Sequence, residues 1–347
     1  MKTFQISGTF GNSSIFVGES ITRIGNYVPV ENTVILADTR VSHYYRELFP
    51  ACPVISIGLG EKIKTLETVS DIYRQLVDLG ADRATFLLGI GGGIVCDITG
   101  FVASTYMRGI RFGFVSTTLL SQVDASVGGK NGVNLGGYKN MVGTFNQPEI
   151  VICDMALLKT LPRREVLCGM AEIIKHGAIS SAAMVAELES SQKAAMALDP
   201  EVISSLVYQS VAIKAGVVSR DEREHGERRK LNFGHTFGHA IEKCTGLAHG
   251  EAVAIGMAMA ARLSVTRKML SQADAHRLIR LIQSYDLPVH PPVETDILLA
   301  AMEKDKKREG RNIHFVFLDT IGNAQVERIT LDALRERVRI TDFSGNF

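Results

Sequence analysis

Three histidines in the second half of the chain have the spacing of a metal site. His235 and His239 are four residues apart, so a helix places both on one face, and His249 follows ten residues later. Imidazoles bind first-row divalent ions, and two or three of them with one carboxylate make a credible ligand set. The HExxH pattern of zinc proteases is absent from the sequence. The spacing therefore indicates a metal site with His235 and His239 as joint ligands, and the alternative is a structural pair of histidines on a helix.

Charged residues around these histidines can serve either a ligand or the surface. Glu172 and Lys175 lie one turn apart on a predicted helix, a pattern more typical of a surface salt bridge. Lys214, Glu224 and Arg228 precede the histidines, and a charged run follows at 304–308. Charge runs usually mark a solvated face, yet several cations near a metal also suit a substrate with a carboxylate or phosphate group.

A glycine turn in the first half of the chain is a candidate nucleotide site. Residues 91–93 are all glycine and stand between a predicted buried strand and a predicted helix. Glycine lets the backbone approach a ligand closely, and the free N–H groups of a helix start attract phosphate. The turn departs from GxGxxG because Ile94 stands at the last glycine position, and no acid follows about 20 residues on. Asp38, at the end of an earlier strand, is either the ribose contact or a turn-forming acid.

The segment 124–134 interleaves glycines with groups that can bind an anion. Asp124, Lys130 and two asparagines occur within it, and Lys139 and Asn140 follow a few residues later. One interpretation is a solvent loop. The other is a flexible loop that folds a cation and amides onto an anionic ligand.

The elements that must position these residues fall into two groups. Short apolar runs at 33–38, 54–57, 85–90, 112–116 and 150–153 predict strands, and they alternate with helical patterns at 66–79 and 94–106. This alternation predicts a mostly parallel sheet covered by helices. Beyond residue 161 long helical patterns dominate, at 202–223, 235–243, 251–268 and 271–285, with one short strand at 314–318. We therefore expect an α/β domain over 1–160 and a mainly α-helical domain over 161–347.

Composition limits the classes of partner. The chain has 347 residues, and its 38 Lys and Arg against 37 Asp and Glu give a net charge of +1. This balance offers no basic field for nucleic acid or an acidic membrane surface, so an anionic ligand requires a local positive pocket. The longest apolar stretch, 252–263, is short of a bilayer span, and the start lacks the apolar region of a signal peptide. The odd count of five cysteines without a CxxC pair indicates buried reduced thiols of a cytoplasmic protein.

Taken together, these motifs resemble the 3-dehydroquinate synthase family of sugar phosphate cyclases over nearly the whole chain. The order and spacing of the matching segments carry the resemblance: GEKIK at 60–64, GGGIVCD at 91–97, YMRG at 106–109, TTLL at 117–120, DASVGGKNGVN at 124–134, KN at 139–140, EIIK at 172–175, RRKLNFGHTFGH at 228–239, HGE at 249–251 and DKK at 305–307.

The resemblance implies a nicotinamide-binding α/β domain followed by a helical metal-binding domain. It also implies the conversion of 3-deoxy-D-arabino-heptulosonate 7-phosphate to 3-dehydroquinate and phosphate, a step of the shikimate route to aromatic amino acids. NAD would accept hydride from C5 and return it within one turnover, with zinc (or cobalt) polarising the C4 and C5 hydroxyls. Phosphate elimination, reduction, ring opening and aldol closure would follow, so the net reaction is that of a lyase.

The resemblance assigns residue roles and changes one assignment made from spacing. The implied zinc ligands are Glu172, His235 and His249, with His239 close by in a polar role. The implied substrate contacts are Lys130, Asn140, Lys175, Lys214, Arg228 and Asn232, with Lys306 or Lys307, and Glu224 in the polar network. Arg108 is expected near the phosphate, from the partner subunit of a homodimer. The implied NAD contacts are Asp38, Glu61, Lys64, Gly92, Gly93, Asp97, Thr117, Thr118 and Lys139, with Asp124 beside the nicotinamide.

Two residues depart from the family pattern, and two other functions remain as alternatives. Cys96 stands where glycine is common, which would crowd the nucleotide turn slightly, and Asn131 replaces a threonine. Other sugar phosphate cyclases share the architecture, but the cations Lys214 and Arg228 with the late lysine pair favour an acid sugar. A metal-dependent polyol dehydrogenase of similar fold is the second alternative and predicts net NADH accumulation.

Overall fold

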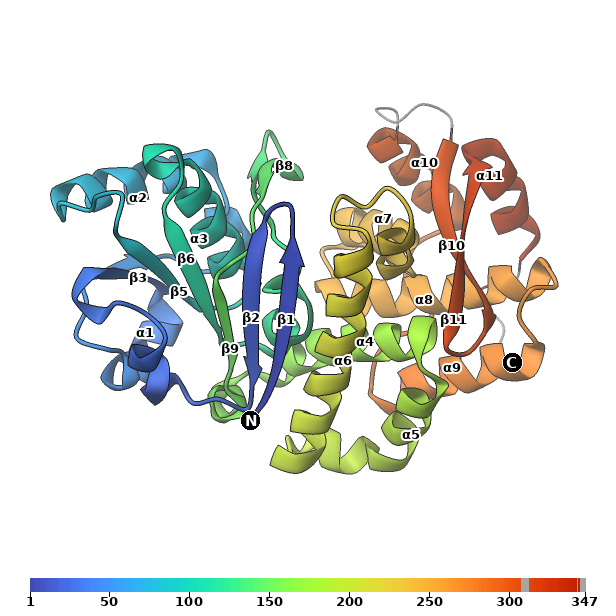
Figure 1. Ribbon diagram of the computed structural model, residues 1–347. Helices are drawn as coiled ribbons and strands as arrows, with labels where there is room; N and C mark the ends of the chain where they lie inside the picture. Colours follow the sequence, from blue (N-terminus) through green and yellow to red (C-terminus); the bar gives the residue numbers. More distant parts are fainter. Residues whose placement is uncertain (307–311, 342, 344–347) are drawn as a thin grey trace. The chain divides into compact units, whose positions relative to one another are not determined.

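The computed structural model describes residues 1–306, 312–341 and 343, with only the backbone of 303–306, and it contains two compact units (Figure 1). The first unit comprises Met1–Pro162 and Ile203–Glu222. The second comprises Arg163–Val202 and the described residues from Arg223 onward. Contacts thus group residues 203–222, from the helical half of the sequence, with the first unit. The domain boundary that we expect from the sequence at residue 160 remains a prediction.

A seven-stranded sheet forms the first unit, in the order β1-β2-β9-β6-β5-β3-β4 (Figure 1). Its strands are β1 Lys2–Gly8, β2 Gly11–Val17, β3 Thr33–Asp38, β4 Val54–Ile57, β5 Phe86–Gly91, β6 Arg111–Ser116 and β9 Ile150–Cys153. Only β1 pairs in an antiparallel manner, and every other neighbouring pair is parallel. The five predicted strands and the mostly parallel sheet are confirmed, whereas the β1–β2 hairpin was not predicted.

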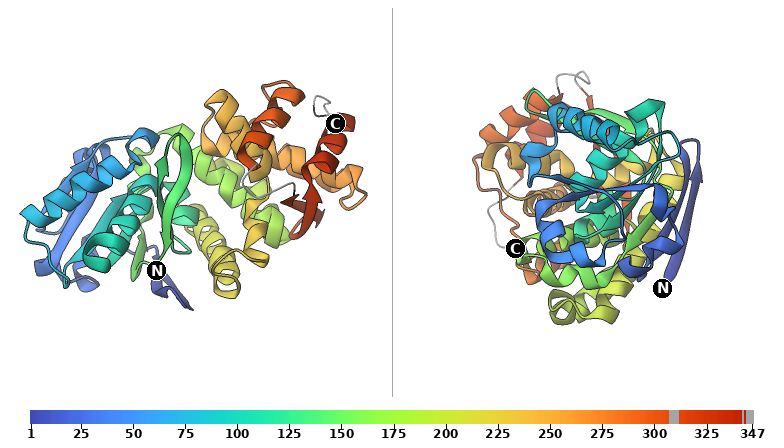
Figure 2. Two further views of the ribbon diagram at one scale, coloured as in Figure 1. Left: turned by 90° about the horizontal axis from the view of Figure 1, so that it is seen from above. Right: turned by 90° about the vertical axis from the view of Figure 1, so that its left-hand side faces the viewer.

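Both faces of this sheet are covered. On one face, Ile35, Phe86, Val115 and Ile152 join a core with the short helix η1 Ile21–Asn26. On the other face α3 Gly93–Thr105 passes so close to β5 that a Cβ at Gly89 would lie 2.5 Å from Thr99 Oγ1. Helix α2 Leu66–Asp78 lies beside α3 (Figure 2), and α1 Thr39–Tyr45 follows β3. The glycine in β5 thus permits the close helix–sheet packing that a larger residue would prevent.

The segment predicted as a loop at 124–134 is largely ordered secondary structure. A π-helical turn, η6 Ser121–Ala125, precedes a two-stranded hairpin of β7 Lys130–Leu135 and β8 Tyr138–Phe145. Asn131 is buried, and its Nδ2 donates to the carbonyls of Gly129 at 3.0 Å and Asn146 at 2.9 Å. The solvent-loop interpretation is therefore wrong, and Asn131 braces the hairpin from within.

Helix α6 Pro200–Arg220 is the helix of the described residues that is long and apolar enough to cross a membrane. Half of its apolar window is buried inside the protein. Its Tyr208 ring packs on Phe4 of β1 at 4.8 Å between centroids, with Lys2 Nζ 3.9 Å from the same ring. These contacts attach α6 to the edge hairpin of the sheet.

The second unit is mainly helical, as the sequence predicts. Its helices are α4 Arg163–Ser180, α5 Ala182–Met196, α7 His235–Thr245, α8 His249–Thr266, α9 Gln272–Ser284, α10 Thr295–Lys306 and α11 Leu331–Ile340. Strands β10 Asn312–Thr320 and β11 Asn323–Thr330 pair antiparallel. Helix α8 is buried from Ala252 to Ser264, so its apolar residues surround the whole helix rather than one stripe.

Short helical turns connect these elements. They are η2 Val30–Asn32, η3 Arg46–Leu48, η4 Glu61–Ile63, η5 Tyr106–Arg108, η7 Met155–Thr160 and η8 Glu227–Asn232. All five cysteines are free, and Cys52, Cys96, Cys153 and Cys168 are buried. Cys244 is exposed, so the prediction of a buried thiol is wrong at that position.

Candidate active site

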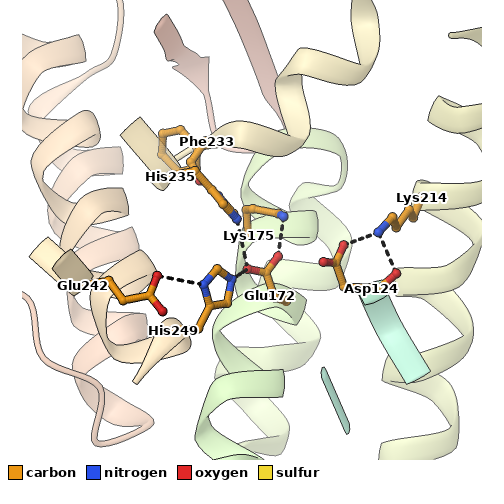
Figure 3. Close-up of polar contacts among 8 residues, drawn as sticks. All are labelled: Asp124, Glu172, Lys175, Lys214, Phe233, His235, Glu242 and His249. Atoms are coloured by element: carbon orange, nitrogen blue, oxygen red, sulfur yellow. Dashed lines mark hydrogen bonds and ion pairs between the residues drawn. The ribbon is translucent and has the colours of Figure 1, made fainter. Parts of the chain in front are cut away.

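Glu172, His235 and His249, all of the second unit, converge on one another (Figure 3). His249 Nε2 lies 3.5 Å and His235 Nε2 3.6 Å from Glu172 Oε1, and the Glu172 carboxylate is fully buried. A tetrahedral zinc ion with ligands at ~2.0–2.1 Å would hold its ligand atoms roughly 3.3 Å apart. The observed separations and the chemistry of one carboxylate with two imidazoles therefore fit a divalent metal.

The three side chains of the cluster come from three different helices, and each occupies a specific position in its helix. Glu172 lies within α4, whereas His235 and His249 are the first residues of α7 and α8. Gly234 precedes α7 with φ of +80°, a left-handed conformation that glycine adopts without strain. Glu251 Oε2 accepts from the Ala248 N–H at 2.8 Å at the start of α8.

An ion pair at the surface ties α4 to α8. Arg164 donates to both carboxylate oxygens of Glu251, at 3.0 and 2.7 Å. The hydrogen bonds from Arg164, and to a lesser extent the bond from the Ala248 N–H, lower the pKa of Glu251 although burial opposes them. This bidentate contact fixes the helix that carries Glu172 against the start of the helix that carries His249.

Glycines let the ligand helices approach each other closely. A Cβ at Gly256 of α8 would lie 2.0 Å from the Gly234 carbonyl oxygen before α7. A Cβ at Gly250 would lie 2.4 Å from Cys168 Cα of α4. Contacts this short with backbone atoms exclude any side chain at both positions, so the spacing of the three ligands depends on these glycines.

The titration behaviour of the cluster reflects burial opposed by its own charges. Burial alone would raise the pKa of Glu172, but the Lys175 ammonium and the two imidazoles outweigh it and hold this pKa well below its usual range. Burial and the nearby Lys175 hold the pKa of His235 well below its usual range. Burial also disfavours the charged form of His249, yet the Glu172 and Glu242 carboxylates raise its pKa to about 9. Glu172 is thus a carboxylate and His235 neutral near pH 7, as metal ligands require.

Two further groups orient the imidazoles. His235 Nδ1 lies 3.3 Å from the Phe233 carbonyl oxygen, and a proton on Nδ1 leaves the Nε2 lone pair toward Glu172. Glu242 Oε2 lies 3.8 Å from His249 Nδ1 on the side away from Glu172 (Figure 3). Glu242 was missed in the sequence, although it follows His235 by seven residues on the same face of α7.

Of the two predicted ligand sets, the structure brings together the one implied by the family resemblance, Glu172, His235 and His249, and not the pair His235 and His239 suggested by spacing. His239 lies near the cluster, with its ring centroid 5.3 Å from that of His235, but it is not in the group whose ligand atoms converge. The Glu172–Lys175 ion pair exists, but both side chains are buried, so the prediction of a surface salt bridge is wrong. A buried carboxylate with this cation on one oxygen and imidazoles beside the other is part of a site rather than of the surface.

Other residues of the second unit that the sequence predicted for the site are Asn232, Arg228, Glu224 and the late lysine pair. Asn232 donates a short hydrogen bond from Nδ2 to Glu224 Oε1, and Arg228 is only 3% exposed. Glu224 has φ of +64°, an uncommon conformation for a residue with a side chain. Lys307 lies outside the described residues, and of Lys306 only the backbone at the end of α10 is described.

In the first unit, the glycine turn lies at the carboxyl ends of β5 and β6. The Thr117 N–H donates to the Gly91 carbonyl at 2.9 Å, and a Cβ at Gly92 would lie 2.9 Å from Thr118 Cγ2. Gly92 is the N-cap of α3, and its position leaves the first N–H groups of the helix without a side-chain cap from that residue. A helix start with glycines beside it is the cradle that a phosphate requires, so this turn fits a nucleotide.

Several predicted cofactor residues of this unit contact one another directly. Lys64 is buried and donates from Nζ to Asp97 Oδ2 and Asn140 Oδ1. Burial raises the pKa of Asp97 although the Lys64 ammonium opposes that effect. Lys214 of α6 donates to the carboxylate and the backbone carbonyl of Asp124 (Figure 3). The buried ammonium groups of Lys64 and Lys214 are thus each held by an acid.

Five other positions that the sequence singled out lie elsewhere in the first unit. Asp38 is the N-cap of α1 and accepts from the Val41 N–H at 2.8 Å, and burial raises its pKa despite that hydrogen bond. Arg108 lies in the turn after α3 with φ of +69°. Lys130 and Lys139 are exposed residues of the β7–β8 hairpin. Cys96 is buried in α3, and burial raises the pKa of its thiol.

This combination of fold and candidate site is similar to that of sugar phosphate cyclases solved with NAD+ and a divalent metal. The chain is similar to a 2-deoxy-scyllo-inosose synthase solved with carbaglucose-6-phosphate, NAD+ and Co2+, with a TM-score of 0.85 and 27% identity over 98% of this chain and 100% of the other. It is also similar to ValA, a 2-epi-5-epi-valiolone synthase from Streptomyces hygroscopicus with NAD+ and Zn2+ bound, with a TM-score of 0.84 and 25% identity over 98% of each chain. A probable glycerol dehydrogenase from Sinorhizobium meliloti shares the fold at a TM-score of 0.68 and 16% identity, over 96% of this chain and 97% of the other.

Sequence comparison narrows the class to one family. Residues 54–168 match the 3-dehydroquinate synthase N-terminal domain, and residues 169–308 match the C-terminal domain. A 3-dehydroquinate synthase from Dehalococcoides mccartyi strain BAV1 is 42% identical over 90% of both chains. Another from Geobacter sp. strain M21 is 46% identical over 81% of this chain and 79% of its own. The chain belongs to the 3-dehydroquinate synthase family, and the resemblance found in the sequence is confirmed.

Proposed function

We propose that the chain converts 3-deoxy-D-arabino-heptulosonate 7-phosphate to 3-dehydroquinate and phosphate in the shikimate pathway, as a cytoplasmic homodimer. The observation that carries the proposal is the cluster of buried Glu172 with partly buried His235 and His249, whose separations fit a divalent ion, in a chain of this family. Lys64, Lys175 and Lys214 are buried cations, each paired with an acid of the chain, and an anionic substrate or cofactor would compete with that acid for the ammonium group.

Glu172, His235 and His249 would hold the metal, for which we propose zinc, with cobalt as the alternative. When bound, the ion would act as a Lewis acid that makes substrate hydroxyl protons easier to remove. The protein keeps the ligands ready: Lys175 holds the Glu172 carboxylate ionised, and the Phe233 carbonyl orients the His235 ring. His249 must lose its proton before it can bind the ion, because the two neighbouring carboxylates raise its pKa to about 9.

The first unit would hold NAD at the glycine turn, with Gly92, Gly93, Thr117 and Thr118 around its phosphates. NAD supplies a hydride acceptor that is regenerated within the turnover, so that no net oxidation occurs. Lys64 and Asp97 fix each other beside the turn, and Asp124 is held by Lys214. We further propose the remaining cofactor contacts Asp38, Glu61 and Lys139.

Substrate binding is proposed for cations and amides of both units. Asn232 is oriented by its hydrogen bond to Glu224, and Arg228 is buried, so the protein itself restrains both side chains. The remaining proposed residues are Lys130, Asn140, Lys175 and Lys214, with His239, Lys306 or Lys307, and Arg108 of the partner subunit at the phosphate. The substrate phosphate would act as the base for its own elimination.

Phosphate release measured together with NADH absorbance tests this function. We expect the zinc-loaded protein with NAD to release phosphate from the heptulosonate phosphate without NADH accumulation. Steady NADH production from glycerol-like alcohols without phosphate release would instead identify a polyol dehydrogenase, whose fold this chain shares. Faster turnover of a hexose 6-phosphate, of which carbaglucose-6-phosphate is an analogue, would identify another cyclase of the class.

A further inference from the structure

Asn134 lies at an irregular position of the β7–β8 hairpin, where the regular pairing with β8 is interrupted. The pairing of the two strands shifts register between Val133 and Leu135, so Asn134 has no partner residue in β8. It pairs instead with Thr65, before α2, in an isolated parallel bridge. Its N–H donates to the Lys64 carbonyl at 2.8 Å. The irregularity therefore attaches the hairpin to a segment about 70 residues earlier in the chain.

The Asn134 side chain uses both ends of its amide. Nδ2 donates to Glu61 Oε1 at 2.7 Å, and Oδ1 accepts from the Asn140 N–H at 2.9 Å. Asn140 has φ of +53°, so the contact from Asn134 holds it in an uncommon backbone conformation. One side chain thus connects the turn η4 Glu61–Ile63 with the far strand of the hairpin.

Lys64 completes a closed polar network. Its Nζ donates to Asn140 Oδ1 and to Asp97 Oδ2 of α3, and the lysine is only 5% exposed. The network therefore joins Glu61, Asn134, Asn140, Lys64 and Asp97 in sequence. Four of these five residues carry proposed cofactor or substrate roles, and Asn134 is the member to which no role has been given.

A pocket lies against this network. Its volume is about 360 Å³, which is within the range of small-molecule sites. The residues that line it are Glu61, Lys62, Thr65, Glu67 and residues 134–139. The pocket wall thus contains the Asn134–Glu61 contact itself together with Lys139.

We propose that Asn134 is a positioning residue for nicotinamide nucleotide binding. This inference rests on the proposed function, which gives Glu61 and Lys139 their cofactor roles. By donating to one oxygen of Glu61, Asn134 fixes the carboxylate so that its other oxygen can accept from a ribose hydroxyl. By accepting from the Asn140 N–H, it fixes the backbone that follows Lys139.

The hydrogen bond from Asn134 to Glu61 can be tested by exchanging which of the two side chains donates and which accepts. Asn134→Asp keeps the size and the acceptor for Asn140, but it removes the donor and places two carboxylates together. We expect the dissociation constant for NAD, measured by titration without substrate, to rise about 10- to 100-fold. When Asn134→Asp is combined with Glu61→Gln, the glutamine amide donates to the introduced carboxylate, so we expect NAD affinity to return to within about threefold of Glu61→Gln alone.

A matched variant and the wild-type protein separate the possible failures. Asn146→Asp is the control, because its amide donates to Ser104 Oγ at 3.0 Å and has no contact with Glu61 in the described structure. We expect it to bind NAD as the wild type does. Unchanged NAD binding by Asn134→Asp would overturn the inference, and so would weak binding that Glu61→Gln does not rescue, since that indicates a general structural role. Wild-type protein that binds no NAD would overturn the proposed cofactor and this inference together.

Discussion

His249 is the residue of the metal cluster whose protonation differs from what a ligand needs. Its neighbours Glu172 and Glu242 are both acids, and they stabilise the imidazolium so that its pKa is raised to about 9 despite burial. Glu172 and His235 have pKa values shifted well below their usual ranges, so near pH 7 Glu172 is ionised and His235 is a neutral imidazole. Metal binding near neutral pH must therefore displace one proton, from His249.

The apparent affinity for zinc is accordingly predicted to rise with pH. With His249 protonated below pH 9, each pH unit between 7 and 9 should strengthen zinc binding about tenfold, and the rise should end above that range. In the metal-free protein the protonation of His249 has the opposite consequence, because folding stability falls as the pH rises. A histidine pKa raised above its unfolded value of about 6.5 stabilises the fold fully below that pH and loses the effect as pH passes 9.

Competition with a calibrated zinc chelator at pH 7, 8 and 9 measures this dependence. Titration calorimetry in buffers of different ionisation enthalpy should show about one proton released per zinc bound at pH 7. A pH-independent zinc affinity, or binding without proton release, would contradict the assignment of the proton to His249.

Residue types and spacing identified the metal ligands only in part. His235 and His249 stand out in the sequence, but the i, i+4 relation favoured His239 over Glu172 because it describes one helix alone. The third proposed ligand, Glu172, comes from α4, whose approach to α7 and α8 depends on tertiary packing. For the same reason the spacing of Glu172 and Lys175 alone favoured a surface salt bridge, because a pair one turn apart does not reveal its burial, whereas the family resemblance placed Lys175 at the substrate.

At the scale of elements, the geometry of the metal cluster is set by contacts between helix backbones. Gly256 of α8 touches the Gly234 carbonyl, and Gly238 of α7 would place a Cβ 3.2 Å from the Ala252 carbonyl oxygen. Helices α7 and α8 thus meet at small residues on both sides. Their separation fixes the distance between His235, at the start of one helix, and His249, at the start of the other.

Gly256→Ala is predicted to separate these helices. Its Cβ would meet the Gly234 carbonyl oxygen at 2.0 Å, and the backbone must move to relieve the overlap. We expect a loss of about 1–3 kcal/mol in the free energy of unfolding and weaker zinc binding, measured by denaturation and chelator competition. Gly216→Ala of α6 is the matched control, because its Cβ would lie 3.5 Å from the nearest atom, the end of Arg220. That variant should gain about 0.5–1 kcal/mol, and equal effects of the two substitutions would exclude the packing argument.

Elements with a strong apolar signal were predicted well, whereas hairpins were not. Strands β3 and β9 have the predicted bounds because they are almost continuous buried runs, and β4, whose burial alternates, has them as well. In β8 most residues are exposed, so no apolar pattern marks that strand. The role of Asn134 depends on a register shift within this hairpin, which spacing along one strand cannot predict.

The whole molecule distributes its chemistry over two units. The three proposed metal ligands belong to the second unit, and the glycine turn with its surrounding residues belongs to the first. The near-zero net charge of the chain has a counterpart inside the protein. The buried lysines Lys64, Lys175 and Lys214 each form an ion pair with an acid. The sequence indicated a locally positive pocket, but these cations are already neutralised by acids of the chain itself. A substrate or cofactor anion must therefore compete with Asp97, Glu172 or Asp124 for them.

The proposed metal ligands and the glycine turn proposed to bind NAD belong to different units. We therefore expect that a variant that has lost its metal still binds NAD. His249→Ala removes one of three metal ligands, so the purified protein should lose zinc and phosphate-releasing activity together. Its dissociation constant for NAD should stay within about twofold of the wild-type value, since the residues of the glycine turn proposed to hold NAD belong to the first unit. Metal analysis, NAD titration and phosphate release on the same preparation measure the three properties.

His290→Ala is the matched control for that experiment. His290 belongs to the same unit, and its Nδ1 contacts the Phe343 carbonyl at 3.1 Å, so it should retain both zinc and activity. Full activity of a zinc-free His249→Ala protein would exclude the proposed metal cluster. Loss of NAD binding along with zinc would instead show that the metal orders the nucleotide turn, and the two units would then have to be treated as one binding system.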